Sequence, residues 1–225
     1  MRTITLRRSL VALFAAAISF GAITQTQAAS QDKSVLRIGY QKYGTLVLLK
    51  AKGTLEKRLA EQGVEVKWTE FPGGPQLLEG LNVGSIDFGV TGETPPVFAQ
   101  AAGAQLAYFA RETPSPAAQA ILVRDGSPLR NLADLKGKTF AFGSISSTSG
   151  SLMPRYFMLK DGIEPEQYFK RIAYSGAHDA TAAWVEAGKA DAGVLNASVW
   201  DKLVAAGKVD TAKVRVISTT PPYYD

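Results

Sequence analysis

The stretch 139–160, TFAFGSISSTSGSLMPRYFMLK, decides the fold class. It begins with four residues typical of a buried strand, continues through a loop rich in serine and glycine, and ends in a more regular segment. Because Leu152, Tyr156 and Leu159 recur every three or four residues there, we predict a helix over 152–160. A strand that leads into a helix through a short polar loop is the repeating unit of α/β proteins.

The same unit recurs on both sides of this stretch. Before it, we predict strands over 35–40, 64–71, 86–90, 106–110 and 120–123, and helices over 45–60, 75–83 and 95–102, with Gly53 a weak point of the first helix. Besides the strand 139–142, we predict strands over 171–174, 191–195 and 214–218, and helices over 177–187 and 197–206. Repeated units of this length imply the α/β class, with parallel-rich sheets and helices on both faces.

Two runs of such units predict two lobes. The first lobe is expected over 30–114 and the second over 115–217. The chain would cross between them near 111–118, around the proline-containing turn 113–116, and cross back over 218–225. Ligands of open α/β sheets lie beyond the carboxyl ends of the strands. The site is therefore expected in the loops that follow the predicted strands.

Residues 1–29 have the composition of a secretory signal. Arg2, Arg7 and Arg8 form a basic start, an apolar run follows over 10–23, and Ala28 lies among small residues suited to cleavage. An apolar run of about 14 residues is too short to span a bilayer, which needs about 20. We expect a cleaved signal peptide and an exported protein, while the Arg7-Arg8 pair does not decide between the Sec and twin-arginine routes.

Composition excludes several kinds of site. The chain has no cysteine and one histidine, which excludes disulfides, thiolate chemistry and metal sites that need two imidazoles. Lys plus Arg is 25 and Asp plus Glu is 20; without the three arginines of 1–29 the balance is 22 against 20. A chain this close to neutral is not built for nucleic-acid backbones. Neither a GxGxxG nor a Walker A motif occurs, so no cofactor and no metal are expected.

Most of the uncharged hydrogen-bonding residues lie in the loops that follow the predicted strands. These loops are 41–45, 92–96, 143–150, 175–179 and 196–198. Backbone N–H groups at a helix start point outward and carry partial positive charge, and nearby hydroxyls add further donors. We expect four helix starts from the two lobes to converge on one cleft, where they hold a small oxyanion that hinge closure shields from water.

Each loop also has a purely structural interpretation. The serine-rich loop can cap the helix after it, Thr94 is the natural N-cap before Pro95, and a lone histidine is more often structural. The helix dipole favours a neutral His178 unless an anion lies against it. A Ser–His–Asp set with His178 and Asp179 stays open, although neighbours at one helix start are poorly placed as base and orienting residue.

Several segments resemble the periplasmic solute-binding proteins of ABC importers. Those resembling the aliphatic sulfonate-binding branch are LRIGYQKYGTLVLLKAKGTLEKRL (36–59), WTEFPGGPQLLEGLNVGSIDFGVTGETPPVFAQAAG (68–103) and LADLKGK (132–138). Those resembling the phosphonate- or phosphite-binding branch are FGSISSTSGSLMPRYF (142–157) and YSGAHDATAAWVEAGKADAGVLNASVWDKL (174–203). The resemblance implies the two-lobed type II periplasmic binding protein fold, with a C-terminal part that is apparently missing after the second crossover.

The resemblance also implies a set of ligand-binding residues. The phosphonate-like segments imply that Ser147, Thr148, Ser149 and His178 contact the oxyanion. The sulfonate-like segments imply Gln41, Gly44, Thr45, Glu93 and Thr94, with Asn196 and Tyr40 as weaker candidates.

The function implied is that of a monomeric periplasmic protein that captures aliphatic sulfonates and delivers them to an inner-membrane ABC permease, without catalysis and without nucleic acid. A phosphonate, phosphite or other small-oxyanion binding protein is the first alternative. A secreted hydrolase or a biosynthetic enzyme on the same fold is the alternative from another class; the absence of cysteine disfavours a pyrimidine-precursor synthase, whose family uses a cysteine-rich motif. A sensor module without an importer is a third reading.

Overall fold

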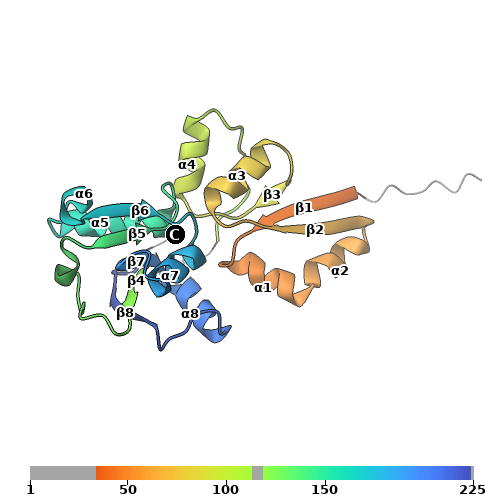
Figure 1. Ribbon diagram of the computed structural model, residues 1–225. Coiled ribbons are helices and arrows are strands. Elements are labelled where there is room, and N and C mark those ends of the chain that lie inside the picture. Colours follow the sequence, from red (N-terminus) through yellow and green to blue (C-terminus); the bar gives the residue numbers. More distant parts are fainter. Residues whose placement is uncertain (1–33, 113–118, 224–225) are drawn as a thin grey trace, which may run out of the picture. The chain divides into compact units, whose positions relative to one another are not determined.

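The computed structural model describes residues 34–112 and 119–223, and its strands form two sheets (Figure 1). The three-stranded sheet has the order β2-β1-β3, and the five-stranded sheet has the order β6-β5-β7-β4-β8. We call residues 34–112 the first lobe and residues 119–223 the second lobe. The predicted signal over 1–29 and the predicted turn over 113–116 lie outside the described residues.

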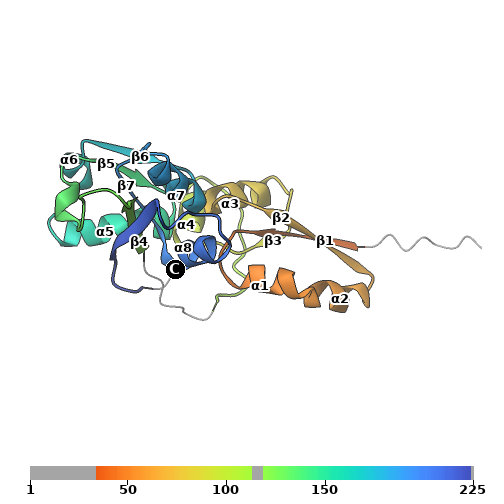
Figure 2. The same ribbon diagram turned by 60° about the horizontal axis from the view of Figure 1, so that its bottom comes forward.

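The first lobe follows the predicted alternation closely. Its elements are β1 (Ser34–Tyr40), α1 (Thr45–Lys52), α2 (Thr54–Ala60), β2 (Val64–Glu70), α3 (Gly74–Asn82), β3 (Phe88–Gly89) and α4 (Thr94–Ala101). β1 pairs in parallel with β2 and β3, and α1 and α2 lie on the other side of this sheet from α3 and α4 (Figure 2). The helix predicted over 45–60 is divided at Gly53, whose left-handed backbone (φ 61°) ends α1.

Two strand predictions in the first lobe need correction. The strand predicted over 106–110 is wrong, because this segment has no regular structure and Tyr108 and Phe109 are 67% and 85% exposed. The strand predicted over 86–90 is reduced to the two residues of β3. A β-strand requires a neighbour for its backbone hydrogen bonds, and no described strand pairs with 106–110.

The second lobe contains a mixed sheet. Its elements are β4 (Gln119–Arg124), a 3₁₀ turn (Ala133–Leu135), β5 (Thr139–Phe142), a π-helical turn (Thr148–Leu152), α5 (Met153–Lys160), α6 (Pro165–Tyr168), β6 (Arg171–Tyr174), α7 (His178–Glu186), β7 (Ala192–Asn196), α8 (Ala197–Ala205) and β8 (Val214–Thr219). β5 pairs in parallel with β6 and β7, but β4 runs antiparallel to β7 and β8. The predicted parallel-rich pairing is therefore confirmed, with β4 as the antiparallel strand, which a loop with one 3₁₀ turn, rather than a helix, joins to β5.

Alternate residues of β4 pack on opposite faces of this sheet. Ile121 and Val123 contribute to a cluster with Phe140 and Met158, on the side of α5. Ala120 and Leu122 contribute to a second cluster, together with buried residues of α7 and α8. Because side chains of a strand alternate between faces, a fully buried strand needs helices on both sides, as predicted for this chain.

The first lobe has a smaller buried cluster, formed by Leu77, Leu78 and Ile86. In the second lobe, β8 runs to Thr219, two residues beyond the predicted end of that lobe. No helix within residues 34–112 and 119–223 is long and apolar enough to cross a membrane.

Candidate functional site

Predicted site residues from the two lobes contact one another where strands lead into helices. The backbone N–H of Thr94, in the first lobe, donates to Thr148 Oγ1 of the second lobe at 3.0 Å. The ring of Tyr43 lies edge-on to that of His178, with 6.2 Å between the centroids. The loop after β1, the start of α4, the turn before α5 and the start of α7 therefore come together, as the sequence predicted.

These contacts leave little empty space. A cavity of about 20 Å³ lies beside them and is lined by Gln41, Lys42, Tyr43, Phe71, Pro72, His178, Asp179 and Val199. Such a volume holds about one water molecule. A ligand larger than a water molecule therefore needs the helix starts of the two lobes to separate before it can enter.

The serine-rich loop divides into a capping residue and two buried hydroxyls. Ser147 Oγ accepts the Gly150 N–H at 3.0 Å and caps the π-helical turn, which precedes α5, the helix predicted over 152–160. Thr148 and Ser149 are only 5% and 2% exposed. Thr148 Oγ1 accepts the Thr94 N–H, and Ser149 Oγ lies 3.4 Å from His178 Nε2. The structural interpretation thus applies to Ser147, while Thr148 and Ser149 face the junction of the lobes.

The glycines of this loop allow its close turn. The Gly143 N–H donates to Gly150 O at 2.8 Å. A Cβ added to either glycine would lie 3.1 Å from the Cα of the other, which is closer than most real contacts of a Cβ atom. Side chains at these two positions would push Thr148 and Ser149 out of place.

His178 begins α7 and is held in one tautomer. Its Nδ1 accepts the Asn196 backbone N–H at 3.4 Å, so in the neutral ring the proton is on Nε2, which then donates to Ser149 Oγ. Burial lowers the pKa of His178 to about 4, although the carboxylate of Asp179 raises it to a lesser extent. At neutral pH the ring is therefore an uncharged N–H donor, which agrees with the effect expected from the helix dipole.

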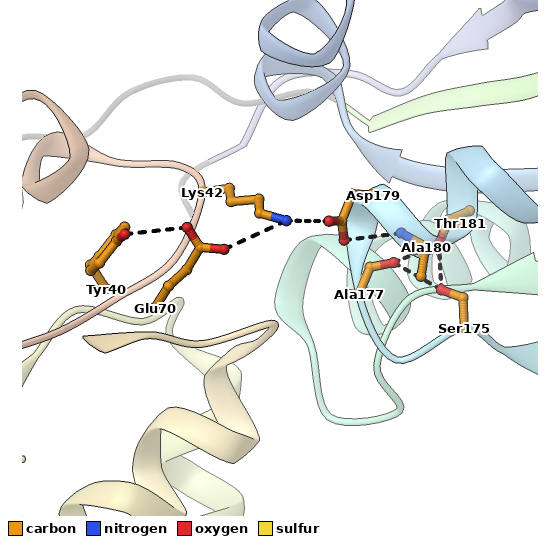
Figure 3. Close-up of polar contacts among 8 residues, drawn as sticks. All are labelled: Tyr40, Lys42, Glu70, Ser175, Ala177, Asp179, Ala180 and Thr181. Carbon is orange, nitrogen blue, oxygen red and sulfur yellow. Dashed lines mark hydrogen bonds and ion pairs between the residues drawn. The ribbon is translucent and has the colours of Figure 1, made fainter. Parts of the chain in front are cut away.

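This arrangement differs from a Ser–His–Asp triad. In the tautomer described, Nε2 carries a proton and cannot take one from Ser149. Asp179 does not orient the ring: its carboxylate accepts the Ala180 N–H at 3.0 Å and forms an ion pair with Lys42 (Figure 3). The described geometry thus provides hydrogen-bond donors without an activated nucleophile.

Gln41 and Tyr43 hold the first-lobe side of the site together. Gln41 is buried, and its Nε2 donates to Val90 O at 3.2 Å and to the Tyr43 hydroxyl at 3.3 Å. That hydroxyl also accepts the Gly92 N–H at 3.2 Å. Gln41 lines the cavity, as predicted for a site residue, whereas the contribution of Tyr43 was not predicted.

The start of α1 faces a carboxylate of the chain itself. The Thr45 N–H donates to Glu112 Oε1 at 3.2 Å, and the Thr45 hydroxyl donates to the same atom. Gly44, with φ 79°, provides the turn before the helix. The donors of this helix start are therefore taken by a carboxylate of the chain itself, and Gly44 and Thr45 do not line the cavity.

The remaining predicted residues have mainly structural contacts. Glu93, not Thr94, is the N-cap position of α4; it is exposed and makes no capping hydrogen bond. Thr94 is the first residue of the helix, because the prolines after it fit the first turn. Asn196 Oδ1 caps α8 by accepting the Ser198 N–H at 2.9 Å, and Tyr40 donates to Glu70 Oε2 at 3.2 Å.

The predicted residues lie apart from the larger hollow of the second lobe. A larger hollow of about 570 Å³ lies in the second lobe and is lined in part by Arg124, Lys138, Asp191 and Lys213; it contains none of the predicted residues. Across the described ranges, no group of three His, Asp or Glu side chains is arranged to hold a metal ion.

Comparison with known proteins assigns the chain to a family. Residues 52–225 match the family described as "ABC transporter, phosphonate, periplasmic substrate-binding protein". The chain belongs to this family. A putative aliphatic sulfonates-binding protein of Escherichia coli (strain K12) is 52% identical over 127 residues, which are 56% of this chain and 39% of that relative. The chain thus spans about two fifths of the length of this curated relative.

Solved structures confirm both branches of the resemblance. The alkanesulfonate-binding protein SsuA of Xanthomonas axonopodis pv. citri, bound to MOPS, is 40% identical with a TM-score of 0.67, and the match covers 83% of this chain and 61% of that one. PhnD1 of Prochlorococcus marinus (MIT 9301), in complex with methylphosphonate, is 29% identical with a TM-score of 0.67, covering 86% and 75%. The expected fold, that of the type II periplasmic binding proteins, is confirmed.

Proposed function

We propose that this member of the family is the periplasmic substrate-binding component of an ABC transporter, and that it captures small oxyanions, aliphatic sulfonates in particular. The observation that carries the proposal is the junction of donors from both lobes, the Thr94 N–H on Thr148 next to Ser149 and His178. When the lobes separate, these donors can turn to the oxygens of an anion. Hydrogen bonds to charged acceptors are about twice as strong as neutral ones, which favours the exchange.

The charges at the junction favour a monoanion. His178 is neutral at pH 7, and Lys42, the cation that lines the cavity, is paired with Asp179 and Glu70. A buried dianion would have a positive partner only if His178 took up a proton against its lowered pKa, and an unpaired buried charge is costly. Sulfonates therefore suit the site better than phosphonate dianions. A phosphonate or phosphite ligand remains the second candidate, supported by the methylphosphonate complex of PhnD1.

Location and partners belong to the same proposal. The predicted signal over 1–29 would direct the chain to the periplasm, where it would act as a monomer and deliver its ligand to an ABC permease of the inner membrane. The proposed lobes over 30–114 and 115–217 would rotate about the two crossovers, which admits the ligand and then encloses it.

Isothermal titration calorimetry with the full chain tests this function. We expect methanesulfonate, and other short alkanesulfonates, to bind the protein. Ser149→Ala should lower the affinity by about 10- to 100-fold, the loss typical of one buried hydrogen bond to a charged group. Ser127→Ala, whose hydroxyl accepts the Leu129 N–H in the same lobe, is the matched control and should bind like the wild type. Absence of binding to sulfonates, methylphosphonate, phosphite and sulfate would contradict the proposal.

A further inference from the structure

A chain of polar contacts connects the two lobes beside the proposed site (Figure 3). Tyr40 donates to Glu70 Oε2 at 3.2 Å, and Glu70 Oε1 lies 3.6 Å from the ammonium of Lys42. The same ammonium forms an ion pair with Asp179 in the first turn of α7. Tyr40, Lys42 and Glu70 belong to the first lobe and Asp179 to the second. The ion pair therefore joins residues 137 positions apart in the sequence.

Both ends of this contact are fixed within their own lobes. Glu70, at the end of β2, holds Lys42 on the first-lobe side. Asp179 accepts the Ala180 N–H through Oδ1 and presents its other oxygen to Lys42. A carboxylate is also favoured by the partial positive charge of a helix start. Two groups held in this way lose less freedom when they pair than two mobile surface side chains would.

The exposure of the pair limits its strength. The side chains of Lys42 and Asp179 are 41% and 35% exposed, and ion pairs at this level are weak and readily broken. A weak contact across a moving junction changes the ratio of closed to open molecules without preventing opening. This is the behaviour needed of a protein that must also release its ligand.

We propose that Lys42 is a positioning residue that does not contact the ligand. Its ion pair with Asp179 holds together the ligand-binding corners of the two lobes, by which we mean the helix starts that carry Thr94 in the first lobe and Thr148 and His178 in the second. The competing role for Lys42 is direct attraction of the anion. The two roles make opposite predictions for Asp179→Asn. Loss of the ion pair should favour the open form, whereas direct attraction should become stronger once Asp179 no longer neutralises Lys42 and no longer repels the anion.

A distance measurement without ligand tests the ion pair independently of the proposed function. The chain has no cysteine, so Lys57→Cys and Lys202→Cys, at exposed positions of α2 and α8, give one pair of nitroxide labels. Pulsed electron spin resonance then reports the distribution of distances between the lobes. We expect Lys42→Met and Asp179→Asn each to lower the ratio of short to long distances by about 3- to 5-fold. Lys67→Met, which removes an ion pair within β2, is the matched control and should leave the ratio unchanged.

The double variant shows whether the two residues act on each other. Lys42→Met with Asp179→Asn should change the ratio no more than either single variant, because the second change removes a partner that is already lost. Additive effects, or a Lys42→Met distribution identical to that of the wild type, would overturn the proposal.

Methanesulfonate titrations separate the ion pair from direct attraction. The proposal predicts a 3- to 5-fold lower affinity for both Lys42→Met and Asp179→Asn, while a higher affinity of Asp179→Asn would overturn it. The titration rests on the proposed function, but the distance measurement between the spin labels does not. If no ligand binds while the distances shift as expected, only the proposed function fails.

Discussion

Methylphosphonate affinity is expected to fall by about 100-fold on His178→Ala, whereas methanesulfonate affinity should fall by about 10-fold. Both ligands lose the hydrogen bond from Nε2–H. A dianion against the ring also raises the pKa of His178 from about 4, so the ring can take up a proton and provide a full charge. A sulfonate monoanion gains much less from protonation. Calorimetry at a pH where the phosphonate is a dianion measures both losses.

The matched control for this variant keeps a donor but not a titratable ring. His178→Gln retains an N–H group and should recover part of the sulfonate affinity while leaving the phosphonate loss largely in place. Equal losses for the two ligands in His178→Ala would contradict the role given to the imidazole.

The imidazole of the free protein should titrate near pH 4, well below the ordinary value of about 6.5. Because this is the chain's single histidine, a two-dimensional NMR spectrum of the ring contains one titrating signal. We expect this signal to keep the neutral Nε2–H pattern from pH 8 to about pH 5. A midpoint near 6.5 would show that the ring is solvated and would remove the neutral donor on which the proposed site depends.

The same shift has a consequence for stability. Between about pH 6.5 and pH 4 the unfolded chain binds a proton at His178 that the folded chain does not. The free energy of unfolding should therefore fall as the pH drops through this window, and the contribution of His178 is fully present above it. Burial raises the pKa of Asp179, but its contacts with Lys42 and Ala180 lower it overall. The stability that this carboxylate contributes is lost only at more acidic pH, as it becomes protonated.

The sequence predicted most of the fold because its signals are local. Strand-like runs and helical spacing place the elements to within a few residues, and Gly53 divides the first helix where a left-handed residue was needed. The failure over 106–110 and the reversed direction of β4 have one cause. Both depend on which strand lies next to which, and this pairing is decided by distant parts of the chain.

The site was predicted in part for a related reason. Thr94, Thr148, Ser149 and His178 follow strands at the carboxyl edges of the two sheets, where open α/β sheets bind ligands, and these edges face each other at the junction of the lobes. Thr45 fits the same rule, yet its backbone N–H and its hydroxyl donate to Glu112, 67 residues away in the sequence. No periodicity or motif indicates such a partner.

The contact of Lys42 with Asp179 could not be predicted from the sequence either. Each residue has an ordinary local interpretation, one as a surface cation and the other as an acid in a first helical turn. Only the approach of the two lobes makes them partners. The sequence could therefore indicate where an anion would bind, but not what holds the binding corners together.

Hydrogen exchange with and without methanesulfonate tests the central claim most directly, namely that helix starts from both lobes enclose one oxyanion. We expect slower exchange in the ligand complex at peptides covering 90–98 in the first lobe and 143–152 and 175–182 in the second. Peptides covering 54–63, in α2 and away from these corners, should be unaffected. Slower exchange confined to one lobe, or no change in either, would contradict it.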